Sequence, residues 1–148
     1  MTYAAHTITD IFGAGQSVTA TAQDFNINGM LNEDVHGIVI GTGNTPVDIT
    51  DYQLVAQIMD GSAAGQMIHN AEAFDATVTV SDPDCTVDTW RNFNNNSGAS
   101  ITVKETGLYC YSSTPTLYYL CLVRDVPAEI VVPDGGGCYV KYTAKITE

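Results

Sequence analysis

The sequence predicts an all-β protein built as a single antiparallel β-sandwich, of jelly-roll or Ig-like type. Two observations predict it. Thr, Val, Ile and Tyr dominate the patterned segments, and Gly, Asn, Asp and Pro interrupt them at intervals typical of short strands. The length of 148 residues fits one domain with one core. We expect residues 37–148 to form the sandwich and residues 1–36 to form an extended arm or first strands packed on the same domain.

The first strand expected within the sandwich is the β-branched run from His36 to Gly41. The loop that follows, residues 41–46, resembles a phosphate-binding loop only superficially, because it lacks the Lys-Ser/Thr ending and contains Pro46. We interpret it as a turn. Beyond it, apolar residues at helical spacing between Thr50 and Ile58 predict at most one short helix.

Further strands are expected at residues 74–80, 86–93 and 99–105. Between the last two lies a five-residue loop, Asn94 to Gly98, of residue types that tolerate left-handed backbone angles. The sequence therefore predicts a β-hairpin whose turn is this loop, rather than a binding site made of asparagine amides.

Residues 117–126 are apolar on both faces, which predicts a central strand or one that lies in a subunit contact. The last strand, residues 138–147, alternates with period two. Its expected core face consists of Cys138, Val140, Tyr142, Ala144 and Ile146.

The charge of the chain is unevenly distributed. Residues 1–90 contain 12 of the 17 acidic residues and no Lys or Arg, so the whole formal charge of −12 lies there. Such a field repels phosphate backbones, which argues against nucleic acid as a partner. Two interpretations of the acidity remain open: solubility, or a face selected for a basic partner or for divalent cations.

The chain shows no pattern of a signal peptide and no apolar run long enough to cross a membrane. Without an export signal we expect the four cysteines to be reduced, and none has the spacing of a metal site. These residues are Cys85, Cys110, Cys121 and Cys138.

No motif for catalysis, for a cofactor or for a metal is present, and the three histidines are widely separated. We therefore expect no enzyme activity and no cofactor. One binding function remains as an alternative: a carbohydrate-binding module in which Trp90 and several tyrosines stack against sugar rings. The tyrosines are Tyr109, Tyr111, Tyr118 and Tyr119.

Four segments, taken in order, resemble small structural proteins of tailed bacteriophages. They are GTGNTPVDITDYQL, RNFNNNSGASITVKETGLYC, LYYLCLVRDV and VVPDGGGCYVKYTAKIT, within residues 37–147. The resemblance implies a virion component that assembles in the host cytoplasm. Decoration or cementing of the capsid is the first choice, and a tail, tail-fibre or baseplate position is the alternative. It also implies binding to the major capsid protein or another virion protein, and self-association, which we expect to give a trimer.

The positions that carry the resemblance are expected to be architectural. We predict that Arg124 pairs with Glu105 at a strand end, with Asp125 nearby, because a planar guanidinium can hold two carboxylates in a fixed fork. The remaining candidate residues are Asp51, Tyr52, Asn96, Gly98, Gly107 and Tyr109.

Overall fold

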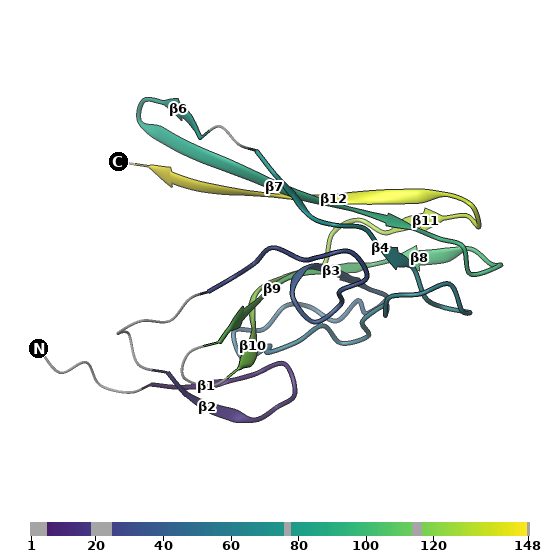
Figure 1. Cartoon of the computed structure of the whole chain (residues 1–148), viewed down its shortest axis with the longest axis horizontal. Helices are drawn as coiled ribbons and strands as arrows, with labels where there is room; N and C mark the ends of the chain where they lie inside the picture. The colour runs from purple at the N-terminus through teal and green to yellow at the C-terminus, as the bar shows by residue number, and fades with distance from the viewer. Residues whose placement is uncertain (1–5, 19–24, 76–77, 114–116, 148) are drawn as a thin grey trace, which may run out of the picture.

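The computed structural model describes residues 6–18, 25–75, 78–113 and 117–147 (Figure 1). In these residues the chain forms strands and no helix, which confirms the predicted all-β class. The segment 50–58, where at most one short helix was expected, contains no helix and is irregular. The strands are β1 (His6–Thr9), β2 (Gly15–Val18), β3 (Gly37–Gly41), β4 (Ile68–His69), β5 (Ala73–Phe74), β6 (Thr79–Ser81), β7 (Asp84–Asn94), β8 (Ile101–Val103), β9 (Glu105–Ser112), β10 (Tyr118–Asp125), β11 (Ile130–Val132) and β12 (Gly137–Thr147).

Two antiparallel sheets form the layers of the sandwich. One has the order β12-β7-β4, with β5 and β6 also paired to β7, and the other has the order β10-β9-β3. Two smaller sheets, β1-β2 and β11-β8, complete the described fold. The longest pairing joins β7 and β12 over eleven residues each, and Figure 1 shows this ribbon above the other layer.

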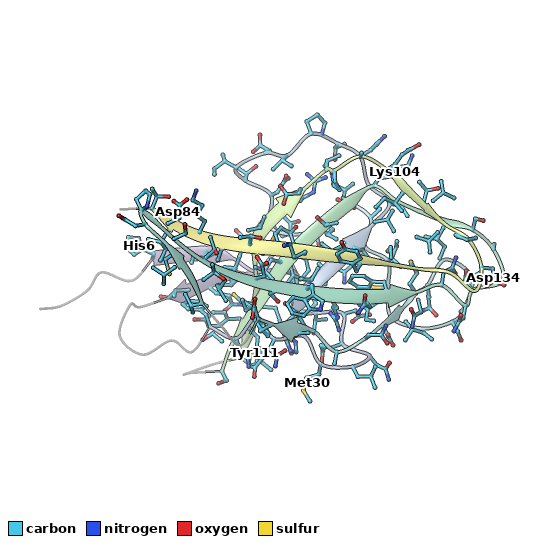
Figure 2. The ribbon with its side chains drawn as sticks, turned by 90° about the horizontal axis from the view of Figure 1, so that it is seen from above. His6, Met30, Asp84, Lys104, Tyr111 and Asp134 are labelled. Atoms are coloured by element: carbon cyan, nitrogen blue, oxygen red, sulfur yellow. The ribbon has the colours of Figure 1, made fainter. Side chains whose placement is uncertain are left out.

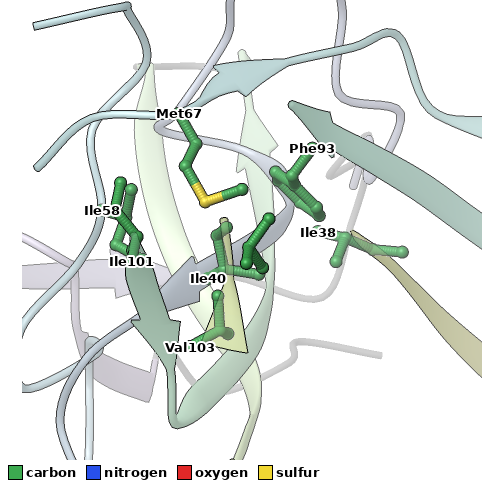
Figure 3. Packing of buried hydrophobic residues seen from close by; sticks show 8 residues of the cluster. Ile38, Ile40, Ile58, Met67, Phe93, Ile101 and Val103 are labelled. Atoms are coloured by element: carbon green, nitrogen blue, oxygen red, sulfur yellow. The ribbon is translucent and has the colours of Figure 1, made fainter. Parts of the chain in front are cut away.

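The main core lies between the two layers. Ile38 and Ile40 of β3 pack against Phe93 of β7, and Met67 fills the space among them (Figure 3). Every second residue of these strands points to the same face, so this packing follows from period-two alternation. The rest of the cluster consists of Ile58, Ile101, Val103 and Val132. A second cluster, Ile11, Val39, Leu54 and Tyr109, covers the other face of β3 and β9.

The predicted hairpin around residues 94–98 is wrong, although the turn exists. β7 pairs with β12 and β8 pairs with β11, so the loop joins two different sheets. The buried side chain of Asn95 explains the change of direction, because its Nδ2 donates to the carbonyls of Ala99 (2.8 Å) and Val132 (2.9 Å). Turn-forming residues specify that the chain bends, but not which strand it pairs with afterwards.

β10 is an edge strand of its sheet and not a central strand, which was one of the two arrangements expected from its apolar faces. The other, a subunit contact, stays a prediction. A β-bulge between Cys121 and Val123 interrupts the pairing with β9. Tyr118 and Leu120 are buried, whereas Leu122 and Val123 are exposed. The apolar side chains on the second face of β10 are therefore exposed rather than buried in the described chain.

The alternation predicted for the last strand holds along the first half of β12, where Cys138, Val140 and Tyr142 pack against the main core. Ala144 and Ile146 share this face but are exposed. The end of the β7-β12 ribbon projects beyond the other layer (Figure 1). Ala144 and Ile146 belong to this end of β12 and are therefore not buried as expected.

The described parts of residues 1–36 contact the sandwich. β1 and β2 form a hairpin, and the backbone amide of Ile11 in its turn donates to the carbonyl of Tyr119 at 3.0 Å. Residue 26 bridges to Tyr111 through both backbone groups. Residues 11 and 26 thus bond to β10 and β9, while the division of the chain at residue 36 stays a prediction.

Candidate functional site

Most of the candidate site residues gather around the end of β10, where Arg124 is 5% exposed. Its Nε donates to Glu105 Oε2 at 3.1 Å, so the predicted pair is present. Its Nη1 donates to Asp51 Oδ2 at 2.8 Å. The second carboxylate of the fork is therefore Asp51, whereas the exposed Asp125 lines a groove beside β12. Burial opposes the charge of Arg124, but the hydrogen bonds to Asp51 and Glu105 outweigh it and raise its pKa.

Glu105 is fully buried and binds the backbone of the loop between β3 and residue 57. Its Oε1 accepts the amides of Gly43 (3.0 Å) and Ala56 (2.7 Å), and its Oε2 accepts that of Val55 (3.1 Å). A Cβ atom on Gly41 would lie 2.6 Å from Glu105 Oε1. The glycines therefore let the backbone approach the carboxylate closely.

Two more candidate residues, Tyr109 and Gly107 of β9, contact Leu54 in the same loop. The hydroxyl of buried Tyr109 accepts the amide of Leu54 at 2.6 Å, and burial raises the pKa of this hydroxyl. A Cβ on Gly107 would meet the Leu54 side chain at 3.1 Å. Tyr52 lies nearby against the turn of the β1-β2 hairpin, at Gly13. We call the assembly of Arg124, Glu105, Asp51 and Tyr109 with residues 41–56 the loop clasp.

Asn96 and Gly98 do not belong to the loop clasp. Both lie in the exposed connection between β7 and β8, where Gly98 has a φ of 82° and donates its amide to Asp134 Oδ1 at 2.9 Å. Asn96 is exposed, and the asparagine that organises this corner is its neighbour Asn95.

Sequence reasoning missed a second buried guanidinium, that of Arg91 in β7. Its three nitrogens donate to five backbone carbonyls at distances from 2.6 to 3.4 Å. The carbonyls belong to Met30, Glu33, His36, Ile38 and Asn70. Burial lowers the pKa of Arg91. The only sequence signal was that Arg91 shares one strand face with Phe93, an apolar residue two positions away.

Glu72 lies beside this guanidinium and binds the same segments. Its Oε2 accepts the amides of Gly29 (3.0 Å) and Ile38 (3.1 Å), and its Oε1 accepts the hydroxyl of Thr89 (2.6 Å). Arg91 therefore satisfies carbonyls and Glu72 satisfies amides of one irregular region, residues 28–38. Such buried groups must be paired to be tolerated, and here the backbone is their partner.

The remaining basic side chains form surface ion pairs. Lys141 and Lys145 extend from the outer face of β12 to Asp88 (3.0 Å) and Asp84 (2.7 Å) of β7, and Lys104 lies 3.5 Å from Glu129. Figure 2 looks down on this ribbon, with Asp84 near one end and Asp134 near the other. All five basic residues of the chain are thus engaged within it.

The described residues contain no group of three or more His, Cys, Asp or Glu side chains arranged to hold a metal ion. They also contain no helix of the length and hydropathy needed to span a membrane. No disulfide joins the four cysteines in the structure, and Cys110 is buried whereas the other three are half-buried. Burial raises the pKa of both Cys110 and Cys121 to about 11.

The stacking platform for sugars is not assembled in one place. Trp90 lies half-buried in β7, whereas the four tyrosines lie in β9 and β10 of the other sheet. Tyr109 and Tyr118 are buried, and Tyr111 and Tyr119 pack against His36. Comparisons with protein-family models, with curated proteins and with solved structures find no match for this chain.

Proposed function

We propose that this chain is a non-enzymatic structural protein of a bacteriophage virion that decorates the capsid surface. The observation that carries the proposal is that every Lys and Arg side chain forms its ion pairs and hydrogen bonds within the chain itself. Arg91 and Arg124 are buried, and the three lysines are paired with carboxylates. The formal charge of −12 is consequently presented to the surroundings without exposed, unpaired Lys or Arg side chains to offset it.

A strongly acidic surface attracts a basic protein surface and speeds the encounter with it. Exposed carboxylates occur on several separate connections of the described chain, including Asp48, Asp75 and Asp82. A decoration protein must stay soluble before assembly and then cover a broad surface, and a dispersed acidic field serves both requirements. We infer that the binding surface of the shell is basic.

The buried charges support an architectural role for the molecule. Glu105 and Arg124 bind loop 41–56, and Glu72 and Arg91 bind residues 28–38. Glu105, Glu72 and Arg91 form most of their hydrogen bonds with backbone groups, and Arg124 adds one to the carbonyl of Thr45. These bonds fix long connections that strands do not hold. Rigid loops reduce the entropy lost on docking.

A position in the tail, a fibre or the baseplate is the alternative within the same class, and it requires the same surface properties. The two positions are distinguished by whether the basic partner surface belongs to the head or to the tail. A carbohydrate-binding module is not proposed, because two of the tyrosines it needs, Tyr109 and Tyr118, are buried.

The test uses phage heads assembled without this protein. After incubation with the purified chain, the heads should bind it and rupture at a higher temperature, because a ligand that binds only the intact shell stabilises it. Binding should weaken as NaCl is raised from about 0.05 to 0.5 M, since salt screens exposed charges. Binding to tails instead of heads would favour the alternative, and binding to neither would overturn the proposal.

A further inference from the structure

The strand β12 has one free edge. It pairs with β7 along all eleven residues, and within the described chain no strand pairs with its other side. The unpaired amides and carbonyls of such an edge are a template for another strand. Natural proteins usually protect long edges, for example with charged side chains, bulges or proline. Here both lysines of β12 form ion pairs with carboxylates of β7, on the side away from the free edge.

A groove of about 260 Å³ runs beside this edge. Five consecutive residues of β12, 138–142, line one wall. Successive residues of a strand point to opposite faces, so a groove that touches all five follows the edge of the strand. The other wall is formed by Val103, Thr106, Asp125, Pro127, Ala128 and Ile130, which makes the groove largely apolar.

The C-terminal half of β12 carries exposed apolar side chains. Ala144 and Ile146 lie on the face of β12 that points to the core at Cys138, Val140 and Tyr142. Ile146 is 70% exposed. One half of β12 thus has an apolar groove at its edge, and the other half has exposed apolar residues at alternate positions.

We propose that β12 pairs antiparallel with β12 of a second copy of this chain, with Tyr142 opposite Tyr142 at a twofold axis. In this register Ala144 of one copy lies opposite Val140 of the other, and Ile146 lies opposite Cys138. The exposed residues of each copy then enter the groove of the other. A twofold contact is self-complementary, so both grooves are filled at once.

The two lysines select this register over its neighbours. With Tyr142 on the axis, Lys141 faces Thr143 and Lys145 faces Tyr139. Moving the axis to Thr143 places Lys141 opposite Lys145, and moving it to Lys141 places that lysine opposite itself. Like charges directly opposite each other destabilise a strand pair. A shift that reverses the faces would turn the apolar residues away from the groove.

Pairing at β12 also suits the charge of the molecule. Residues 135–147 contain two lysines and no acidic residue, and the lysines pair with Asp88 and Asp84, so β12 itself adds no negative charge at this edge. Two copies of net charge −12 therefore meet little repulsion from β12 itself when they approach at this edge. The contact is independent of the virion proposal, and its twofold symmetry gives a dimer rather than the trimer that the phage resemblance implies.

Sedimentation velocity of the purified chain under reducing conditions tests the pairing. We expect a concentration-dependent dimer, and Ile146→Lys should weaken dimerisation at least tenfold because it places a charge in the groove. Ile146 is largely exposed in the single molecule, so the urea midpoint measured on the monomer should not change. The matched control is Val80→Lys, another exposed apolar residue of the same ribbon (76% exposed), located in β6 on the far side of β7.

A monomer at all concentrations, a trimer, or equal weakening by both lysine variants would overturn the proposal. A second pair of variants tests the register. Tyr139→Lys should weaken the dimer because the residue faces Lys145 of the second copy, whereas Tyr139→Glu should preserve it. Equal effects of these two substitutions would contradict the proposed register.

Discussion

Arg124 Nη1 and Asp51 Oδ2 lie 2.8 Å apart although 73 residues separate them in the sequence. Together with Glu105, this contact fixes an irregular connection of fifteen residues, 42–56, to the edge of a sheet. The loop has no sheet partners of its own apart from a bridge at its end, between Gly41 and Gln57. Its conformation therefore depends on the buried charged side chains of Arg124 and Glu105 and on the half-buried Asp51.

Glu105→Gln should destabilise the fold by about 3 kcal/mol or more, because it leaves a buried guanidinium with one carboxylate instead of two. Urea unfolding at pH 7 measures the loss. The matched control is Glu129→Gln, which removes an exposed partner of Lys104 and should cost about 0–1 kcal/mol. Equal losses from the two substitutions would show that the loop clasp does not stabilise the fold.

Gly43→Ala should destabilise by about 1–3 kcal/mol, because the added Cβ collides with Oε1 of Glu105 and lies 2.9 Å from Cβ of Val55. The control is Gly15→Ala, whose Cβ would meet only the Thr7 side chain, at 3.3 Å. Thermal unfolding should separate the two variants clearly. An unchanged melting temperature for Gly43→Ala would mean that loop 41–56 is looser than its contacts with Glu105 indicate.

The two buried arginines differ in how far sequence reasoning reaches. Arg124 follows an apolar run and stands next to Asp125, which suggests an ion pair at a strand end, and its pairing with Glu105 was predicted. The identity of the second carboxylate was missed, because Asp51 belongs to an irregular loop that only the tertiary fold brings to the guanidinium. Arg91 stands between Trp90 and Asn92, and a charged residue at such a position in a strand usually faces solvent.

Arg91→Lys should destabilise the protein by about 3 kcal/mol or more, because an ammonium has three donors and cannot serve five carbonyls spread over three segments. Amide hydrogen exchange should accelerate in residues 28–38 before it does so in β9. The control, Lys104→Arg at an exposed ion pair, should change stability by no more than about 0.5 kcal/mol. Uniform acceleration over the whole chain would contradict a local role for Arg91.

The fold stability should decrease as pH falls from about 7.5 to 5.5. Burial, and then the charge of Arg91, lower the pKa of His69 below its ordinary value of 6.5, and burial also lowers that of His36. In this interval the unfolded chain binds protons that the folded chain resists, so stability is present above pH 6.5 and is lost below it. The acidic groups facing His69, Asp34 and Asp60, oppose this effect without reversing it.

The variant His69→Gln isolates the contribution of His69 to this pH dependence. Its urea midpoint should vary less with pH than that of the unchanged chain, while His36 continues to contribute. The two pH profiles are best compared at constant ionic strength, since salt alters exposed ion pairs. Identical slopes would show that His69 accepts a proton as readily in the fold as outside it.

The strand content and the alternation of the last strand were within reach of the sequence because both depend on local residue preferences. Strand partners were not, since the loop around Asn95 carries the signature of a hairpin turn and yet connects two sheets. The exposure of Ile146 was also beyond sequence reasoning. Its alternation with Tyr142 is correct, but the ribbon extends past the layer that covers Tyr142.

The proposed function rests on the location of the chain in a virion, which cryo-electron microscopy of purified phage particles tests most directly. Particles produced from a genome that encodes this chain should show the β-sandwich at regularly repeated positions on the outside of the head, above basic residues of the shell. Absence of the chain from intact particles, confirmed by mass spectrometry of the same preparation, would contradict the account.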